Sequence, residues 1–196
     1  PNQVLSSLGA KSSLSHAIDA CLEAGDEAII LKPYWVSVPD LVKLAGATPV
    51  FAEPNLESIQ KAITPKTCAL FLNSPSNPDG SVYSESFLRG LMKMLEGSDI
   101  WVISDEIYEH LVFDGVKHIS PASLSKDAYE RTLVVSGVSK GYAMTGWRVG
   151  IAGGPEKLVS AMAKLQEQRY TCIPVICQAA VTYALNEPPE LKIEIE

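Results

Sequence analysis

The 196-residue sequence predicts an α/β fold, a three-layer sandwich in which a mostly parallel sheet lies between layers of helices. Two observations predict it. Apolar runs rich in β-branched residues alternate along the chain with segments of helical periodicity, and each run is short enough to be a buried strand. In such sheets ligands bind beyond the carboxyl ends of the strands, so functional side chains are expected just after the strand-like runs.

The predicted elements alternate in order along the chain. Strands are expected at residues 27–31, 48–52, 67–73, 99–107, 132–138 and 148–153. Helices are expected at residues 12–25, 39–46, 55–63, 84–97, 155–168 and 174–187. Gly25 and Gly46 are suited to end their helices, and Pro155 is suited to the first turn of the next one. No strand is expected before the first helix, and the sequences at the two ends suggest a chain truncated at both, the last stretch being an amphipathic PPELKIEIE (188–196).

Composition and charge exclude several classes of protein. Hydrophobic residues make up 46% and charged residues 20% of the chain, as in ordinary globular domains. The net charge is −7 with scattered basic residues, so a nucleic-acid partner is not expected. No apolar run reaches the roughly 18 residues of a membrane span. The four cysteines form no CxxC pair, which favours free thiols and a cytoplasmic protein.

Chemically active side chains follow the predicted strands. The segments in question are Pro33–Trp35, Asn73–Gly80, Asp105–Tyr108 and Ser136–Lys140. Together they bring an indole, an amide, a carboxylate with a phenol, and an amine to one edge of the sheet. This concentration predicts a binding or catalytic site there.

The segment Gly137-Val138-Ser139-Lys140-Gly141 offers two nucleophiles side by side. It fits the G-x-S-x-G elbow of serine hydrolases, but that triad needs a histidine after the serine, and all three histidines precede it. The Ser-x-x-Lys spacing also fails, because residue 137 is glycine. Lys140 is therefore the candidate nucleophile. Its neutral, glycine-flanked setting predicts a desolvated amine able to form a Schiff base, and pyridoxal 5'-phosphate (PLP) is the electron sink that such chemistry needs.

Several segments then resemble one family. NSPSNPDG, SDEIYEHLVFDG and VSGVSKGYAMTGWRVG resemble the signature segments of class I, fold-type-I PLP-dependent aminotransferases, in the same order. LGAK, PYWVS and LAGATPVF are similar to segments of the bacterial-type aspartate aminotransferases. The resemblance covers essentially all 196 residues. It implies that residues 1–196 are the PLP-binding large domain, with the small domain largely absent.

The resemblance also implies roles around the cofactor ring. Lys140 matches the lysine that forms the Schiff base and then transfers a proton. Asp105 matches the carboxylate that faces the pyridine nitrogen, and Tyr108 with Asn77 matches the pair that hydrogen-bonds the cofactor's phenolate oxygen. Asn77 also matches the asparagine near the substrate carboxylate. Trp35 matches the aromatic side chain that stacks on the ring beside the substrate.

The resemblance implies a phosphate site as well. Ala10 and Lys11 stand where a helix is expected to begin, so their backbone N–H groups are suited to the phosphate. Arg148 matches the arginine that clamps it. The family often has a phosphate-binding serine where this chain has Gly137, and the sequence leaves open whether Ser136 or Ser139 replaces it.

One further departure concerns the asparagine loop. The usual NPTG is NPDG here, so Asp79 places a carboxylate where the family has threonine. Aspartate forms local turn hydrogen bonds as threonine does, so we interpret Asp79 as a tolerated variant.

The function implied is transfer of an amino group from an L-amino acid, aspartate favoured, to a 2-oxo acid, with no metal. The resemblance also implies a homodimer, because family members are usually homodimers whose sites are completed by the partner subunit. The segment at 166–178 resembles a stretch that they place near the dimer interface, although by itself it indicates only a pair of amphipathic helices. Two alternatives stay open. One is another fold-type-I PLP enzyme such as a C–S lyase, decarboxylase or synthase. The other is a non-catalytic regulatory module with an aminotransferase-like domain.

Overall fold

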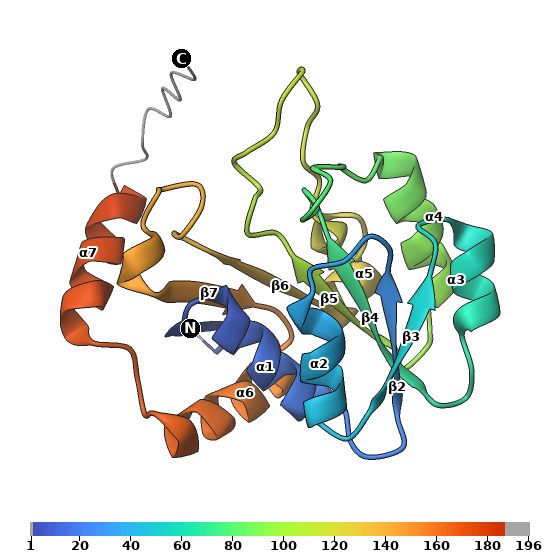
Figure 1. The fold of residues 1–196 in the computed structure, drawn as a ribbon, viewed down its shortest axis with the longest axis horizontal. Coiled ribbons are helices and arrows are strands. Elements are labelled where there is room, and N and C mark those ends of the chain that lie inside the picture. The colour runs from blue at the N-terminus through green and yellow to red at the C-terminus, as the bar shows by residue number, and fades with distance from the viewer. Residues whose placement is uncertain (1, 187–196) are drawn as a thin grey trace.

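The computed structural model describes residues 2–186, which form a seven-stranded sheet with helices on both faces (Figure 1). The strands are β1 Val4–Leu8, β2 Glu27–Leu31, β3 Thr48–Ala52, β4 Thr67–Asn73, β5 Trp101–Asp105, β6 Thr132–Gly137 and β7 Val149–Gly153. The α-helices are α1 Ala10–Cys21, α2 Ser37–Leu44, α3 Leu56–Ala62, α4 Glu85–Leu95, α5 Lys126–Arg131, α6 Glu156–Arg169 and α7 Val175–Asn186. Two short 3-10 helices, η1 Pro121–Ser123 and η2 Thr145–Trp147, complete the list.

The sheet is mixed, with a parallel centre. The strand order is β1-β7-β6-β5-β4-β2-β3, and β3, β2, β4, β5 and β6 pair in parallel. β7 is antiparallel to both β6 and β1. The carboxyl ends of β1, β2, β4, β5 and β6 therefore reach the same edge of the sheet as the first residue of β7. The three-layer, mostly parallel α/β sandwich predicted from the sequence is confirmed.

Each face of the sheet buries its own apolar cluster, because side chains alternate along a strand. Ala28 and Ile30 of β2 pack with residues of α1, α2 and α6 on one face. Ile29 and Leu31 pack with residues of α3, α4 and α5 on the other. Burial on both faces explains why the central strands are continuously apolar in sequence.

The helix starts differ in a way that bears on function. Asn55, Ser84 and Ser125 cap α3, α4 and α5 by accepting a hydrogen bond from a first-turn N–H group. Helix α1 begins after Gly9 with no side-chain cap, as α2 and α6 begin without one. The first N–H groups of α1 therefore stay available at the functional edge of the sheet.

The prediction that no strand precedes the first helix is wrong, because β1 pairs with β7 from Val4↔Gly153 to Leu8↔Val149. Its sequence VLSSL has too few apolar residues to indicate an edge strand. Helix α5 was also unpredicted, being only 6 residues long. The strand expected at 99–107 ends at Asp105. Residue 187 and the amphipathic stretch 188–196 lie outside the described residues.

Among residues 2–186, no helix combines the length and the apolar character needed to span a membrane.

Candidate active site

A cavity of about 370 Å³ opens at the edge where the parallel strands end. Every site residue predicted from the sequence lines it. The lining consists of Ala10, Lys11, Leu14, Trp35, Asn73, Asn77, Asp105, Ile107, Tyr108, Ser139, Lys140, Thr145 and Arg148. The volume lies within the range of small-molecule sites, which is about 300–1,000 Å³. The structure thus brings together residues that are up to 138 positions apart, from Ala10 to Arg148.

The floor of the cavity is built from the paired ends of β4 and β5. Asn73 lies opposite Asp105 in the ladder, and its side-chain amide donates a hydrogen bond of 3.0 Å to the Asp105 carbonyl oxygen. The side-chain oxygen of Asn73 accepts the N–H of Asn77 at 2.7 Å. Asn73 therefore couples the position of Asp105 to that of Asn77. The sequence placed Asn73 at a strand end, but its role as a connector depends on a register that only the structure gives.

The Asp105 carboxyl group is buried without a cationic partner. The side chain is 8% exposed, and burial raises its pKa to about 7, against the opposing hydrogen bond from the Ile107 N–H and with a smaller contribution from the neighbouring Glu106 charge. Within residues 2–186 it forms no ion pair. A cationic ring nitrogen placed against this carboxyl would stabilise its charged form.

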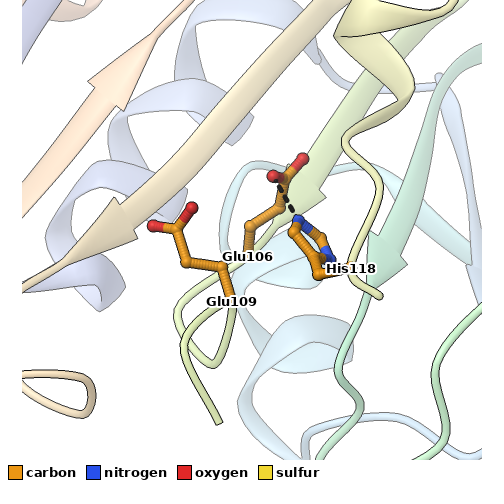
Figure 2. A group of neighbouring side chains, drawn as sticks. All are labelled: Glu106, Glu109 and His118. Atoms are coloured by element: carbon orange, nitrogen blue, oxygen red, sulfur yellow. Dashed lines mark hydrogen bonds and ion pairs between the residues drawn. The ribbon is translucent and has the colours of Figure 1, made fainter. Parts of the chain in front are cut away.

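Beside Asp105, a set of hydrogen bonds ties down the loop after β5. Figure 2 shows the Glu106 carboxylate facing His118, at 2.8 Å, with the Glu109 carboxylate lying apart from this pair. Glu106 also accepts the hydroxyl of Ser120 at 2.7 Å, and Glu109 accepts the hydroxyl of Ser136. The three acid and imidazole groups lie within 4.8 Å of one another, as metal ligands can. Because both carboxylates already have protein donors, the group acts as a structural support.

Lys140 and Tyr108 lie close together in the lining of the cavity. Lys140 lies in the loop after β6, and its Nζ atom is 5.5 Å from the centre of the Tyr108 ring. The expectation of a desolvated amine is wrong, because residue 140 is exposed. The loop after β6 carries Lys140 beyond the buried part of the strand.

Trp35 comes from the loop after β2 and is half-buried at the cavity wall. The Lys11 ammonium lies 4.8 Å from the centre of its ring, a cation–π contact. Lys11 itself is exposed. The indole therefore offers an aromatic surface to the cavity beside a positive charge.

Arg148 lines the cavity together with Ala10 and Lys11 at the start of α1, and this part of the cavity is called the phosphate end below. The Arg148 guanidinium lies directly over Gly9, where a Cβ atom would come within 2.5 Å of it. Gly9 has φ +80°, a conformation that glycine adopts most easily, and it leads into the uncapped start of α1. Arg148 also donates a hydrogen bond of 2.8 Å to the Thr145 carbonyl oxygen. A guanidinium beside free helix N–H groups is suited to a phosphate.

The structure explains why residue 137 is glycine and distinguishes the two candidate serines. A Cβ atom at Gly137 would meet the Val149 carbonyl oxygen at 2.7 Å, so this backbone leaves no room for serine there. Ser139 lines the cavity. Ser136 is not among the lining residues, and its hydroxyl donates to Glu109.

Asp79 lies in the turn after Asn77 and does not line the cavity. Its carboxylate accepts the Ser81 N–H at 3.3 Å and the Ser81 hydroxyl at 3.0 Å. The side chain is exposed. The Asp79 carboxylate thus stabilises the turn by hydrogen bonds to Ser81 and does not line the cavity.

Comparison with known proteins gives the class. Residues 1–196 match the model of the family described as aminotransferase class I and II. The chain is 43% identical over 198 residues to an aspartate aminotransferase of Rhizobium meliloti (strain 1021), covering 96% of this chain and 48% of the relative. It is 44% identical over 194 residues to a probable aspartate/prephenate aminotransferase of Thermus aquaticus, covering 95% and 50%. The chain therefore belongs to the class I and II aminotransferase family.

Solved structures agree. The aspartate aminotransferase of Rhizobium meliloti superposes with a TM-score of 0.93 at 43% identity, covering 96% of this chain and 50% of that one. The Thermus thermophilus aspartate aminotransferase with maleate gives a TM-score of 0.91 at 42% identity, covering 95% and 50%. The fold is that of the fold-type-I PLP-dependent aminotransferases. The chain spans about half the length of the curated relatives it matches.

Aminotransferases of this class use PLP, and the cavity has the groups that this cofactor requires. The buried Asp105 carboxyl suits a ring nitrogen, and Trp35 suits the ring face. Arg148 and the start of α1 suit the phosphate, and the Lys140 amine suits the aldehyde. The donor set therefore fits PLP.

Proposed function

We propose that residues 1–196 form the PLP-binding large domain of an aminotransferase that moves an amino group from an L-amino acid to a 2-oxo acid. The observation that carries this proposal is one cavity lined by Lys140, Asp105 and Arg148. An amine, a buried carboxyl group and a phosphate-binding guanidinium in this arrangement match the three functional groups of PLP. The family membership supports the same function.

Each polar residue of the cavity then has a role in binding or in proton transfer. PLP, when bound, supplies an aldehyde and an electron-withdrawing ring that stabilises negative charge at the substrate α-carbon. Asp105 would hold the proton on the ring nitrogen, and its burial strengthens that interaction. Tyr108 and Asn77 would donate hydrogen bonds to the ring oxygen.

Lys140 would be both the attachment point and the proton carrier. An exposed amine in the loop after β6 could reach the aldehyde of the cofactor, and after substrate binding it would accept the proton of the substrate α-carbon and donate it to the carbon that carried the aldehyde. Trp35 would pack on the ring, and Asn77 would also lie near the substrate carboxylate. Arg148 and the N–H groups of Ala10 and Lys11 would hold the phosphate.

Aspartate is the favoured amino donor. The support is the naming of the relatives as aspartate or aspartate/prephenate aminotransferases at 43% and 44% identity. The 2-oxo acid acceptor follows from the reaction class, because the amino group left on the cofactor must be passed to a second carbonyl carbon.

A homodimer is proposed as the working state, and a cytoplasmic location with it. Helix α7 exposes apolar side chains, with Val175 at 77%, Ile176 at 71% and Tyr183 at 72%. Apolar groups presented on one helix are typical of a protein interface. The four cysteines are all unpaired, which is typical of a reducing compartment.

The test uses the complete purified polypeptide. PLP is added, the mixture is reduced with borohydride, and the modified peptide is located by mass spectrometry. We expect a phosphopyridoxyl label on Lys140 and its loss in Lys140→Ala, whereas Lys93→Ala, which changes an exposed lysine on α4, keeps the label. Amino transfer from aspartate to a 2-oxo acid is then measured. A folded wild-type protein without label would refute the proposal, and a labelled protein without transfer from any amino acid would indicate a lyase or decarboxylase.

A further inference from the structure

The hydroxyl group of Tyr170 connects three elements behind the phosphate end of the cavity. It accepts the N–H of Leu8, the last residue of β1, at 3.2 Å. It forms a hydrogen bond of 2.8 Å with the hydroxyl of Ser12 in the first turn of α1. It donates to the side-chain oxygen of Gln166 in α6 at 2.9 Å. One oxygen atom thus links the strand before the β1–α1 turn to the helix after it.

Gln166 extends this connection into the sheet. The side chain is 5% exposed, and its amide donates a hydrogen bond of 3.0 Å to the Ser6 carbonyl oxygen in β1. Gln166 and Tyr170 lie one helical turn apart at the end of α6. The donor and acceptor of the Gln166 amide are therefore both used in holding β1 and Tyr170.

The turn held in this way is the one that forms the phosphate subsite. Leu8 and Ser12 flank Gly9, Ala10 and Lys11 on either side. On the far side, a Cβ atom at Gly150 would come within 2.4 Å of the Ala10 nitrogen. The backbone of the turn is thus in close contact with β7, and the Tyr170 hydroxyl fixes both of its ends. A shift of either end would move the N–H groups of Ala10 and Lys11 relative to Arg148.

We propose that Tyr170 is a positioning residue that sets the geometry of the phosphate subsite without touching the cofactor, an inference that rests on the proposed function. Tyr170 does not line the cavity. It acts through Leu8 and Ser12, which hold the β1–α1 turn. Its removal should affect binding of the phosphate group and leave the ring and aldehyde contacts unchanged.

The experiment compares two ligands that differ only in the phosphate. Dissociation constants for PLP and for pyridoxal are measured in the complete polypeptide, for wild type, Tyr170→Phe and Ser12→Ala. A neutral hydrogen bond is worth about 1 kcal/mol. Ser12→Ala removes one such bond to the turn and should raise the Kd for PLP about fivefold, and Tyr170→Phe removes two and should raise it further. Both variants should leave the Kd for pyridoxal about unchanged. Inorganic phosphate, used as a competitor against PLP, should lose affinity by a similar factor.

Tyr129→Phe is the matched control. The Tyr129 hydroxyl also donates to a residue next to β1, the side-chain oxygen of Gln3 at 3.0 Å, but on the exposed surface. It should leave both dissociation constants unchanged. Equal weakening of PLP and pyridoxal in Tyr170→Phe, or no change in either, would overturn the positioning role; if that variant does not fold, Ser12→Ala decides. A wild-type protein that binds no PLP overturns the proposed function instead.

Discussion

The two ends of the cavity are built in different ways. The floor lies at the ends of the parallel strands β4 and β5, where Asp105 is 8% exposed and Asn73 hydrogen-bonds its backbone. The phosphate end lies where antiparallel β7 and β1 meet helix α1, and its cation, Arg148, is exposed. The floor therefore holds its carboxyl group in a buried, hydrogen-bonded setting, whereas the phosphate end holds its guanidinium at an exposed position.

This difference predicts that the floor acts on the rate of the chemical step and that the phosphate end acts on affinity for the cofactor. A buried charged group interacts strongly with a neighbouring group that gains charge during the reaction. A change at the floor should therefore alter the rate of the chemical step. An exposed cation fixes a group that does not react, so a change at the phosphate end should alter affinity for the cofactor.

The largest effect is expected at the floor, in Asp105→Asn. A neutral amide cannot hold the ring nitrogen protonated, so turnover at saturating cofactor should fall by about 10²–10³-fold. Asp99→Asn is the control, because this exposed carboxylate lies before the other end of the same strand and should keep full turnover. A normal turnover rate in Asp105→Asn would show that the Asp105 carboxyl group does not contribute to the chemical step.

The same variant should stabilise the cofactor-free protein at high pH. The folded-state pKa of Asp105, about 7, lies above the unfolded value of 3.8. Between these two pH values the folded protein therefore retains a proton that the unfolded chain releases. Stability from this group is thus full below pH 4 and is lost as the pH rises to about 7. At pH 8 the substitution should raise the free energy of unfolding by about 4 kcal/mol relative to its effect at pH 4. Urea unfolding at both pH values measures this, and an equal effect at both would contradict it.

An intermediate effect is expected at the phosphate end, in Arg148→Lys. The substitution keeps the charge but loses the bidentate fork, so the Kd for PLP should rise about 10–100-fold, with turnover at saturating PLP nearly unchanged. Titration of cofactor absorbance and steady-state kinetics separate the two quantities. Arg89→Lys, on the surface of α4, is the control. A loss of turnover at unchanged affinity would contradict the division between the two ends.

The floor was also the end that the sequence predicted well. Central strands are buried on both faces, so β4 and β5 are visible as apolar runs. Asn73 and Asp105 end these strands, and Asn77 and Tyr108 follow them. Placing polar residues after parallel strands was enough to bring them together. What the sequence did not show was the Asn73 contact with the Asp105 backbone, which depends on strand register.

The phosphate end was predicted only from its motifs. The edge strand β1 is half polar, and the antiparallel direction of β7 leaves no mark on its sequence. Without that direction, nothing places Arg148 beside Gly9. The exposure of Lys140 was missed for a related reason, because a loop after a buried strand can turn its side chain outwards. The identity of the phosphate serine stayed open, since neighbouring residues in a loop have no fixed periodicity.

The smallest effect is expected from that serine, in the pair Ser139→Ala and Ser136→Ala. Ser139 lines the cavity, so its hydroxyl is the better placed to bind the phosphate, and its loss should raise the Kd for PLP about threefold to tenfold. Ser136 donates to Glu109 instead, so its loss should leave the Kd unchanged and lower the free energy of unfolding by about 1 kcal/mol. Cofactor titration and urea unfolding of both variants check the pair. The reverse pattern would mean that the Glu109 contact yields to the cofactor, and the phosphate end would then be more adaptable than the floor.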